Sequence, residues 1–156
     1  MSRGSIAAME KSIDSRFTKL WDDNPFVLVG GPTRGIYLEG YGAVFMSEVN
    51  LATGPTMIFR PSNVTREERD RHRQKKLQRL PQLRAALEQA LADSAASLDT
   101  VPSGEQIVIS VLLTKYPWED VTGLPSQIMM QGQKGQLLAA RRSGEPLETA
   151  IHETEF

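Results

Sequence analysis

The sequence predicts an α+β fold: a mainly antiparallel sheet of about four to five strands, with an N-terminal helix, a long kinked central helix and short C-terminal helices packed on it. Apolar residues recur at spacings of three and four near the N-terminus and again over residues 77–91, as on one face of a helix. Short β-rich runs precede and follow that long helical segment. The 156 residues match one domain in size, and no internal repeat divides them.

The first helix is predicted to start at Ser5, which can cap it, and to stop at the Asp22–Pro25 cluster, because the residue before a proline is pushed out of helical geometry. Its apolar stripe consists of Ile6, Met9, Ile13, Phe17, Leu20 and Trp21. Residues 1–4 are expected to be a flexible tail or an expression scar, followed by one globular domain over residues 5–156.

Residues 26–51 are predicted to form an antiparallel hairpin with one long, bent arm. The apolar run 26–29 suits a buried strand, and the glycine-rich stretch 30–35 suits a reversal of the chain. The triplet Gly40-Tyr41-Gly42 interrupts the β-rich stretch 36–51, and it predicts a bulge or a sharp bend.

The central helix is predicted to open at Thr65, where Thr65-Arg66-Glu67-Glu68 has the pattern of a capping box, and to last to about Leu98. Its first half, Arg66–Lys76, holds no large apolar residue and is expected to be largely exposed. Pro81 removes a helical hydrogen bond and predicts a kink or a break. The second half carries a stripe that we expect to be buried, formed by Leu77, Leu80, Leu83, Leu87 and Leu91.

The last third is predicted to hold two strands and two short helices. Gln106–Thr114 is rich in β-branched residues and predicts a central strand, and Ser126–Gln131 predicts another. Leu137–Arg142 and Pro146–Ile151 predict short helices, because the intervening Ser143-Gly144 favours a helix end and proline a helix start.

This order of elements resembles that of roadblock/longin-type domains. The resemblance covers element order across most of the chain and includes no diagnostic motif. It implies a non-enzymatic scaffold that acts through dimerisation.

Composition narrows the classes of function. The absence of cysteine excludes disulfides, thiol nucleophiles, thiolate zinc sites and iron–sulfur clusters. A formal charge of −1 gives no global attraction to nucleic acid or membrane, and no apolar run approaches the roughly 20 residues of a spanning helix. We expect no cofactor and no metal site. The compartment stays open, with a cytoplasmic protein favoured unless an export signal was removed.

No catalytic motif is assembled in the sequence. Gly30 and Gly35 have the outer spacing of a phosphate-binding loop. Such a loop is followed by Lys and a helix, whereas a β-rich stretch follows here. A hairpin turn is therefore favoured over an anion site aided by Arg34. There is no Gly-x-Ser-x-Gly or Ser-x-x-Lys pattern. His72 and His152 are expected to be solvated surface residues.

Two segments carry candidate ligand or partner contacts, the bent hairpin and the loop after the central strand. Their carboxylates could act in acid–base catalysis or bind a cation only if the fold brought them together. Their aromatic side chains could either anchor a ligand or pack over the open end of the core. The candidates are Arg34, Tyr37, Glu39, Tyr41, Tyr116, Trp118, Glu119 and Asp120.

The basic segment of the central helix is a third candidate contact. Between Arg66 and Arg84, eight basic residues stand against three acidic ones. No aromatic residue is interleaved to stack bases, so a solvated or subunit-contacting helix is favoured first, contact with an acidic protein second and nucleic-acid binding last. The contact candidates are Arg66, Arg69, Arg73 and Lys76.

These observations favour a non-enzymatic protein-interaction or assembly domain, binding a protein partner or a second copy of itself. The alternative is a small-molecule-binding protein or enzyme with its site at Gly40–Gly42 and the Tyr116–Asp120 loop. A deep pocket with convergent polar groups near Gly40–Gly42 would favour that alternative.

Overall fold

A computed structural model describes residues 1–22, 31–53 and 64–156, and it confirms the α+β class. The described elements are α1 (Arg3–Thr18), β1 (Arg34–Leu38), β2 (Gly42–Val49), α2 (Arg66–Ser97), β3 (Gln106–Leu113), β4 (Gln127–Gln133), α3 (Lys134–Ser143), the 3₁₀ helix η1 (Leu147–Ala150) and β5 (His152–Glu155). The strands form one sheet in the order β1-β2-β3-β4-β5. The sheet is mostly antiparallel, with β2 and β3 as the parallel pair among the described strands.

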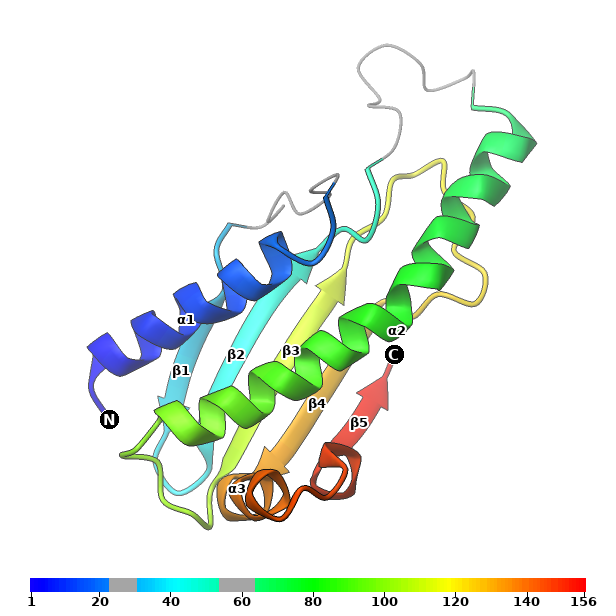
Figure 1. The fold of residues 1–156 in the computed structure, drawn as a ribbon. Coiled ribbons are helices and arrows are strands. Elements are labelled where there is room, and N and C mark those ends of the chain that lie inside the picture. The colour runs from blue at the N-terminus through cyan, green and yellow to red at the C-terminus, as the bar shows by residue number, and fades with distance from the viewer. Residues whose placement is uncertain (23–30, 54–63) are drawn as a thin grey trace.

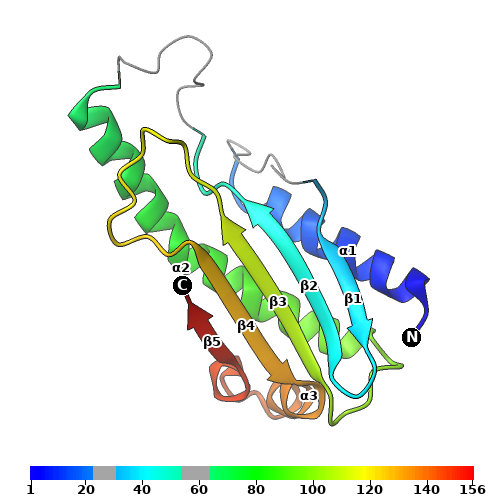
Figure 2. The same ribbon diagram turned by 180° about the vertical axis from the view of Figure 1, so that it is seen from behind.

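The helices cover one face of this sheet. α1 and α2 lie across the strands in Figure 1, and the view from behind in Figure 2 shows the strands in front with both helices beyond them. α3 packs against α2 at one end of the sheet. The opposite face carries no helix from the described part of the chain.

The core lies between the helices and the face that they cover. Alternate strand residues point into it, as the pleat of a β-strand requires. The buried strand residues on this side are Ala43, Phe45, Val49, Ile107, Ile109, Val111, Ile128 and Met130. α1 and α2 meet them with a second set of buried residues, Ile6, Met9, Ile13, Phe17, Leu80, Leu83, Leu87 and Leu91. The predicted burial of the leucine stripe is therefore confirmed for these α2 positions.

α2 is longer than the sheet it packs on. Its 32 residues span about 48 Å, whereas the eight-residue strand β3 spans about 26 Å. The N-terminal half of α2 therefore extends past the strand ends (Figure 1). Thr65 caps this end in the predicted capping box with Glu68. The helix is continuous across Pro81 and its ribbon bends about midway in both views, so the structure has the kink and not a break.

The hairpin differs from the prediction in where the chain reverses. Arg34 and Gly35 lie in β1 rather than in a turn, and β1 pairs with β2 from Arg34↔Met46 to Leu38↔Gly42. Gly40 and Gly42 have φ angles of 81° and 138°, so the triplet forms the hairpin turn and not a bulge. Positive φ angles allow the tight reversal. The predicted strand 26–29 lies outside the described residues.

Both ends of the chain are more ordered than the sequence patterns suggested. α1 begins at Arg3, and Ser2 rather than Ser5 is its cap, because the Ser2 hydroxyl accepts the Ser5 backbone N–H at 3.1 Å. Arg3 thus belongs to a helix and not to a tail. The last predicted helix is the short η1, and β5 follows it as a strand that sequence analysis missed.

The outer edge of β1 is blocked by side chains of α1. The backbone N–H of Gly35 donates to Glu10 Oε1 at 2.7 Å, and its carbonyl accepts from Arg3 at 3.0 Å. At the other edge of the sheet, β5 is four residues long and carries Glu153 and Glu155, both paired with Arg84. Short, charged or covered edges resist pairing with another strand.

The two turn glycines give a matched test of the hairpin. A Cβ at Gly42 would lie 1.8 Å from the Gln106 carbonyl oxygen, whereas a Cβ at Gly40 would meet nothing within 4 Å. We expect Gly40→Ala to cost about 1 kcal/mol, for its left-handed backbone alone. We expect Gly42→Ala to cost at least about 3 kcal/mol, because the clash adds to that strain. Urea denaturation measures both, and equal losses would contradict the observed turn.

Candidate functional site

The two predicted contact segments lie at opposite ends of the sheet. The backbone N–H of Gln106, at the start of β3, donates to the carbonyl of Tyr41 at 2.7 Å. Tyr116 follows the other end of β3, and Gln106 and Leu113 are about 23 Å apart along that strand. Tyr41 and Trp118 therefore cannot line one concavity, and the composite site of the alternative hypothesis does not form.

The hairpin candidates lie at the surface. Arg34, Glu39 and Tyr41 are exposed, and Tyr37 is half-buried. The hydrogen bond to Glu105 raises the pKa of Tyr37, with smaller contributions from burial and from the negative charges of Glu105 and Glu39. No described cavity brings these four side chains together.

The loop candidates fold against the overhanging half of α2. Glu119 Oε1 lies 2.6 Å from Lys76 Nζ and 2.8 Å from His72 Nε2, and Glu119 Oε2 accepts the backbone N–H of Tyr116 at 2.5 Å. The Lys76 ammonium also donates to the carbonyl of Thr114 at 3.2 Å. The side chains of Glu119 and Lys76 are 1% and 3% exposed. The predicted exposure of Arg66–Lys76 is thus wrong for His72 and Lys76, because this loop covers them.

His72, Lys76 and Glu119 form a buried cluster in which burial and hydrogen bonding shift the pKa values in opposite directions. Burial acts to raise the pKa of Glu119, but hydrogen bonds from His72, Lys76 and the Tyr116 backbone outweigh it, so the pKa lies below its ordinary value. Burial lowers the pKa of Lys76, and the hydrogen bond and negative charge of Glu119 only partly offset this. The Glu119 carboxylate is therefore held in place by its hydrogen-bond partners, and the cluster presents no free acid or base.

Two aromatic side chains of the loop close this end of the core. The rings of Tyr116 and Trp118 stack at 5.5 Å between centroids with an interplanar angle of 6°, and the His72 ring lies 4.9 Å from that of Trp118. Trp118 is buried. Of the two interpretations offered by the sequence, the structure supports core closure by Trp118 over an exposed anchor.

The remaining basic candidates border a shallow recess of about 300 Å³ beside this cluster. Arg66 and Arg69 line it together with Asp70 and Asp120, so its charges are mixed. Arg73 reaches Asp120 at 3.6 Å and the Thr122 carbonyl at 3.4 Å. Neighbouring carboxylates leave no surface of uniform positive sign here for a phosphate backbone.

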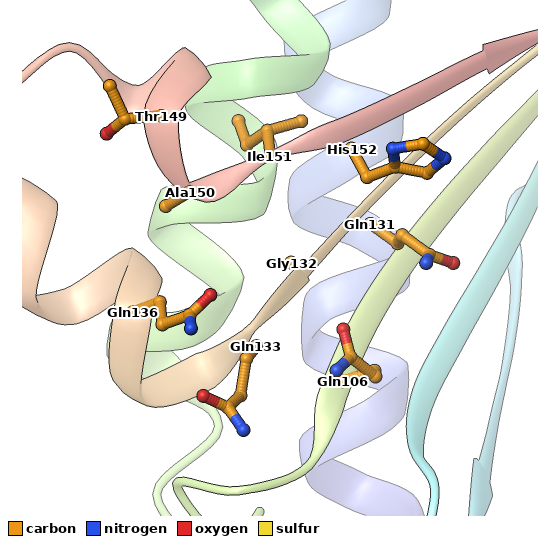
Figure 3. Close-up of a pocket in the computed structure, with 9 residues that line it drawn as sticks. All are labelled: Gln106, Gln131, Gly132, Gln133, Gln136, Thr149, Ala150, Ile151 and His152. Carbon is orange, nitrogen blue, oxygen red and sulfur yellow. The ribbon is translucent and has the colours of Figure 1, made fainter.

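A second recess, of about 280 Å³, lies where β3, β4 and β5 meet α3 and η1 (Figure 3). Its polar side chains are four amides with a hydroxyl and an imidazole, from Gln106, Gln131, Gln133, Gln136, Thr149 and His152. None of these residues was predicted as a site from the sequence, although the alternation of Gln131 and Gln133 across Gly132 places two amides on one side of a strand.

The amide recess continues into the uncovered side of the sheet, which we call the open face. Strand register places its residues in rows across the sheet. The apolar members are Ile36, Leu38, Val44, Met46, Val108, Leu112 and Met129, of which Val108 is buried among its neighbours. Ile36, Leu38 and Met46 are 56%, 47% and 49% exposed. Such an apolar surface is the feature of the described structure that most needs a functional explanation.

Neither a metal centre nor a membrane span is found in the described part of the chain. No group of three or more His, Asp or Glu side chains there is arranged to hold a metal ion. None of its helices combines the length and apolar character needed to cross a bilayer.

The pairing of Glu119 gives a matched test of the buried cluster. We expect Glu119→Ala to lower the free energy of unfolding by about 3–5 kcal/mol, because it leaves the Lys76 ammonium buried without a counter-charge. Asp120→Ala, one residue away, removes a half-exposed carboxylate together with its contacts to Arg73 and Thr122, and should cost only about 1 kcal/mol. Chemical denaturation of both variants at neutral pH checks this. Similar losses from the two substitutions would rule out a special role for Glu119.

No protein-family model, curated protein or solved structure matches this chain, so its function is inferred from its own residues and geometry.

Proposed function

We propose that this chain is a non-enzymatic protein-interaction domain and that the open face of the sheet is its binding surface. The supporting observation is that a five-stranded sheet has helices on one face, while the other face exposes Ile36, Leu38 and Met46. A soluble chain rarely leaves a contiguous apolar patch of several hundred Å² without a partner.

The energetics favour coverage of this face. Complete burial of an Ile, Leu or Met side chain contributes about 1.5–3 kcal/mol relative to full exposure. The three side chains that are about half exposed would therefore gain several kcal/mol together on contact with a partner. They lie on adjacent strands β1 and β2, so one partner can cover all of them.

The face, rather than an edge, is the surface that we propose for contact. Arg3 and Glu10 occupy backbone groups on the outer edge of β1, and β5 is short and acidic. Both features oppose the addition of a further strand. A protein that associates with this domain would then meet the side chains of the open face.

The alternative of a small-molecule site or enzyme receives less support. Its two segments lie at opposite ends of β3, and the polar groups of the Tyr116–Asp120 loop contact each other, α2 and neighbouring loop residues. Nucleic acid is also a poor candidate for the open face, because its strand positions include one basic residue, Arg34, against one acidic residue, Glu48.

Site-specific photo-crosslinking tests the proposed surface. A photoreactive amino acid at Met46 should give protein adducts in cells that produce the full chain, because this side chain is half exposed on the open face, next to Val44 along β2. The same residue at Ala85, on the exposed side of α2, is the control. Mass spectrometry identifies the partner and the contacted peptide. Adducts at Ala85 but none at Met46 would refute the open face as the binding surface.

A further inference from the structure

We infer that the partner of the open face is a second copy of this chain, packed face to face about a two-fold axis. This inference rests on the proposed function, and it adds the identity of the partner. Three properties of the face support it: its charge, the chemistry of its two halves, and its size.

The open face carries fewer charged residues than the chain as a whole. The chain has 37 charged Lys, Arg, Asp and Glu residues, yet the strand positions of this face include Arg34 and Glu48 alone among them. A strongly acidic or basic partner would find no complementary potential here. Two copies, by contrast, can approach without repulsion between like-charged surfaces.

Each half of the open face can pack against the same half of a second copy. β1 and β2 supply the exposed apolar side chains, and β3–β5 supply Gln106, Gln131, Gln133 and His152 at one end. Among the described residues, the side-chain amides of Gln106 and Gln131 have no hydrogen-bond partner within the chain. A primary amide both donates and accepts, so it can pair with another primary amide across a two-fold axis. Apolar residues likewise pack against apolar residues.

The size of the face is of the right order for a dimer. Five strands about 4.8 Å apart, with about six residues each at 3.3 Å, give a flat footprint of roughly 500 Å² before side-chain relief is counted. A standard stable interface buries about 800 Å² of accessible surface on each partner. Stacked sheets pack about 10 Å apart, with side chains from the two faces interleaved. Because both edges of the sheet resist the addition of a further strand, two copies would meet by stacking their open faces.

Light scattering coupled to gel filtration tests the inference. The wild-type chain should elute with twice the mass of one chain. Ile36→Glu and Leu38→Glu should each raise the dimer dissociation constant by roughly 100-fold or more, since each buries a carboxylate whose cross-strand partner is Val44 or Gly42 rather than a cation. The control Ala85→Glu adds the same charge on the exposed side of α2 and should leave the dimer intact. Far-ultraviolet circular dichroism checks that each variant keeps its fold.

The absence of cysteine allows a second, independent readout. Met46→Cys introduces a unique thiol on the open face, and a short bismaleimide should join two such chains, whereas Ala85→Cys should stay monomeric under denaturing electrophoresis. A wild-type chain that is monomeric at all concentrations, or a dimer unaffected by both Glu substitutions, overturns the inference. Photo-crosslinking from Met46 to a different protein would also overturn it while supporting the proposed function. No adduct at all from Met46 would count against both.

Discussion

The packing of the α2 leucine stripe against one face of the sheet is the interaction on which the rest of this structure depends. Leu80, Leu83, Leu87 and Leu91 fill the space above the central strands, and α1 and α3 pack beside them. Helices then occupy that side of the sheet, and the other side is left without one in the described part of the chain. The open face is thus a direct consequence of where the core forms.

The length of α2 has a second consequence. Because the helix extends past the strand ends, its first half has no sheet to pack on, and the loop after β3 takes that place. Glu119 lies between Lys76 and His72, and Trp118 covers the same side of the helix. A buried carboxylate without these partners would carry a large desolvation penalty, so the loop and the helix must be ordered together. We interpret this end as structural and the open face as functional.

Patterns that are local in sequence predicted much of the fold. The capping box at Thr65, the leucine stripe and the β-branched run of β3 each depend on residues close together in the chain, and each was located correctly. β5 was missed because His152–Glu155 has no apolar alternation, and its pairing with β4 follows from the path of η1. Lys134 was not predicted to be buried either. It donates to the carbonyls of Leu98 and Val101 after α2, which are more than thirty residues away in the chain.

The candidate site was predicted less well than the fold, for a physical reason. Residue type indicated that Trp118 and Glu119 matter, but not that they are buried, since burial depends on Lys76 and His72 from another element. Conversely, Ile36 and Met46 have the apolar character of core residues, and their exposure depends on the absence of a covering layer. Coverage of a sheet face is a tertiary property, and a strand sequence with apolar residues on both sides does not reveal it.

Methionine oxidation tests the central claim, that the open face is bare in one chain and covered by a partner, most directly. Met46 lies on the open face and Met130 on the helix-covered face, so the two thioethers report on opposite sides of the same sheet. With dilute protein and hydrogen peroxide, peptide mapping should show rapid oxidation of Met46 and protection of Met130. At high concentration Met46 should become protected as well. Slow oxidation of Met46 in the dilute monomer, at the rate of Met130, would show that the chain itself covers this face and would contradict the account.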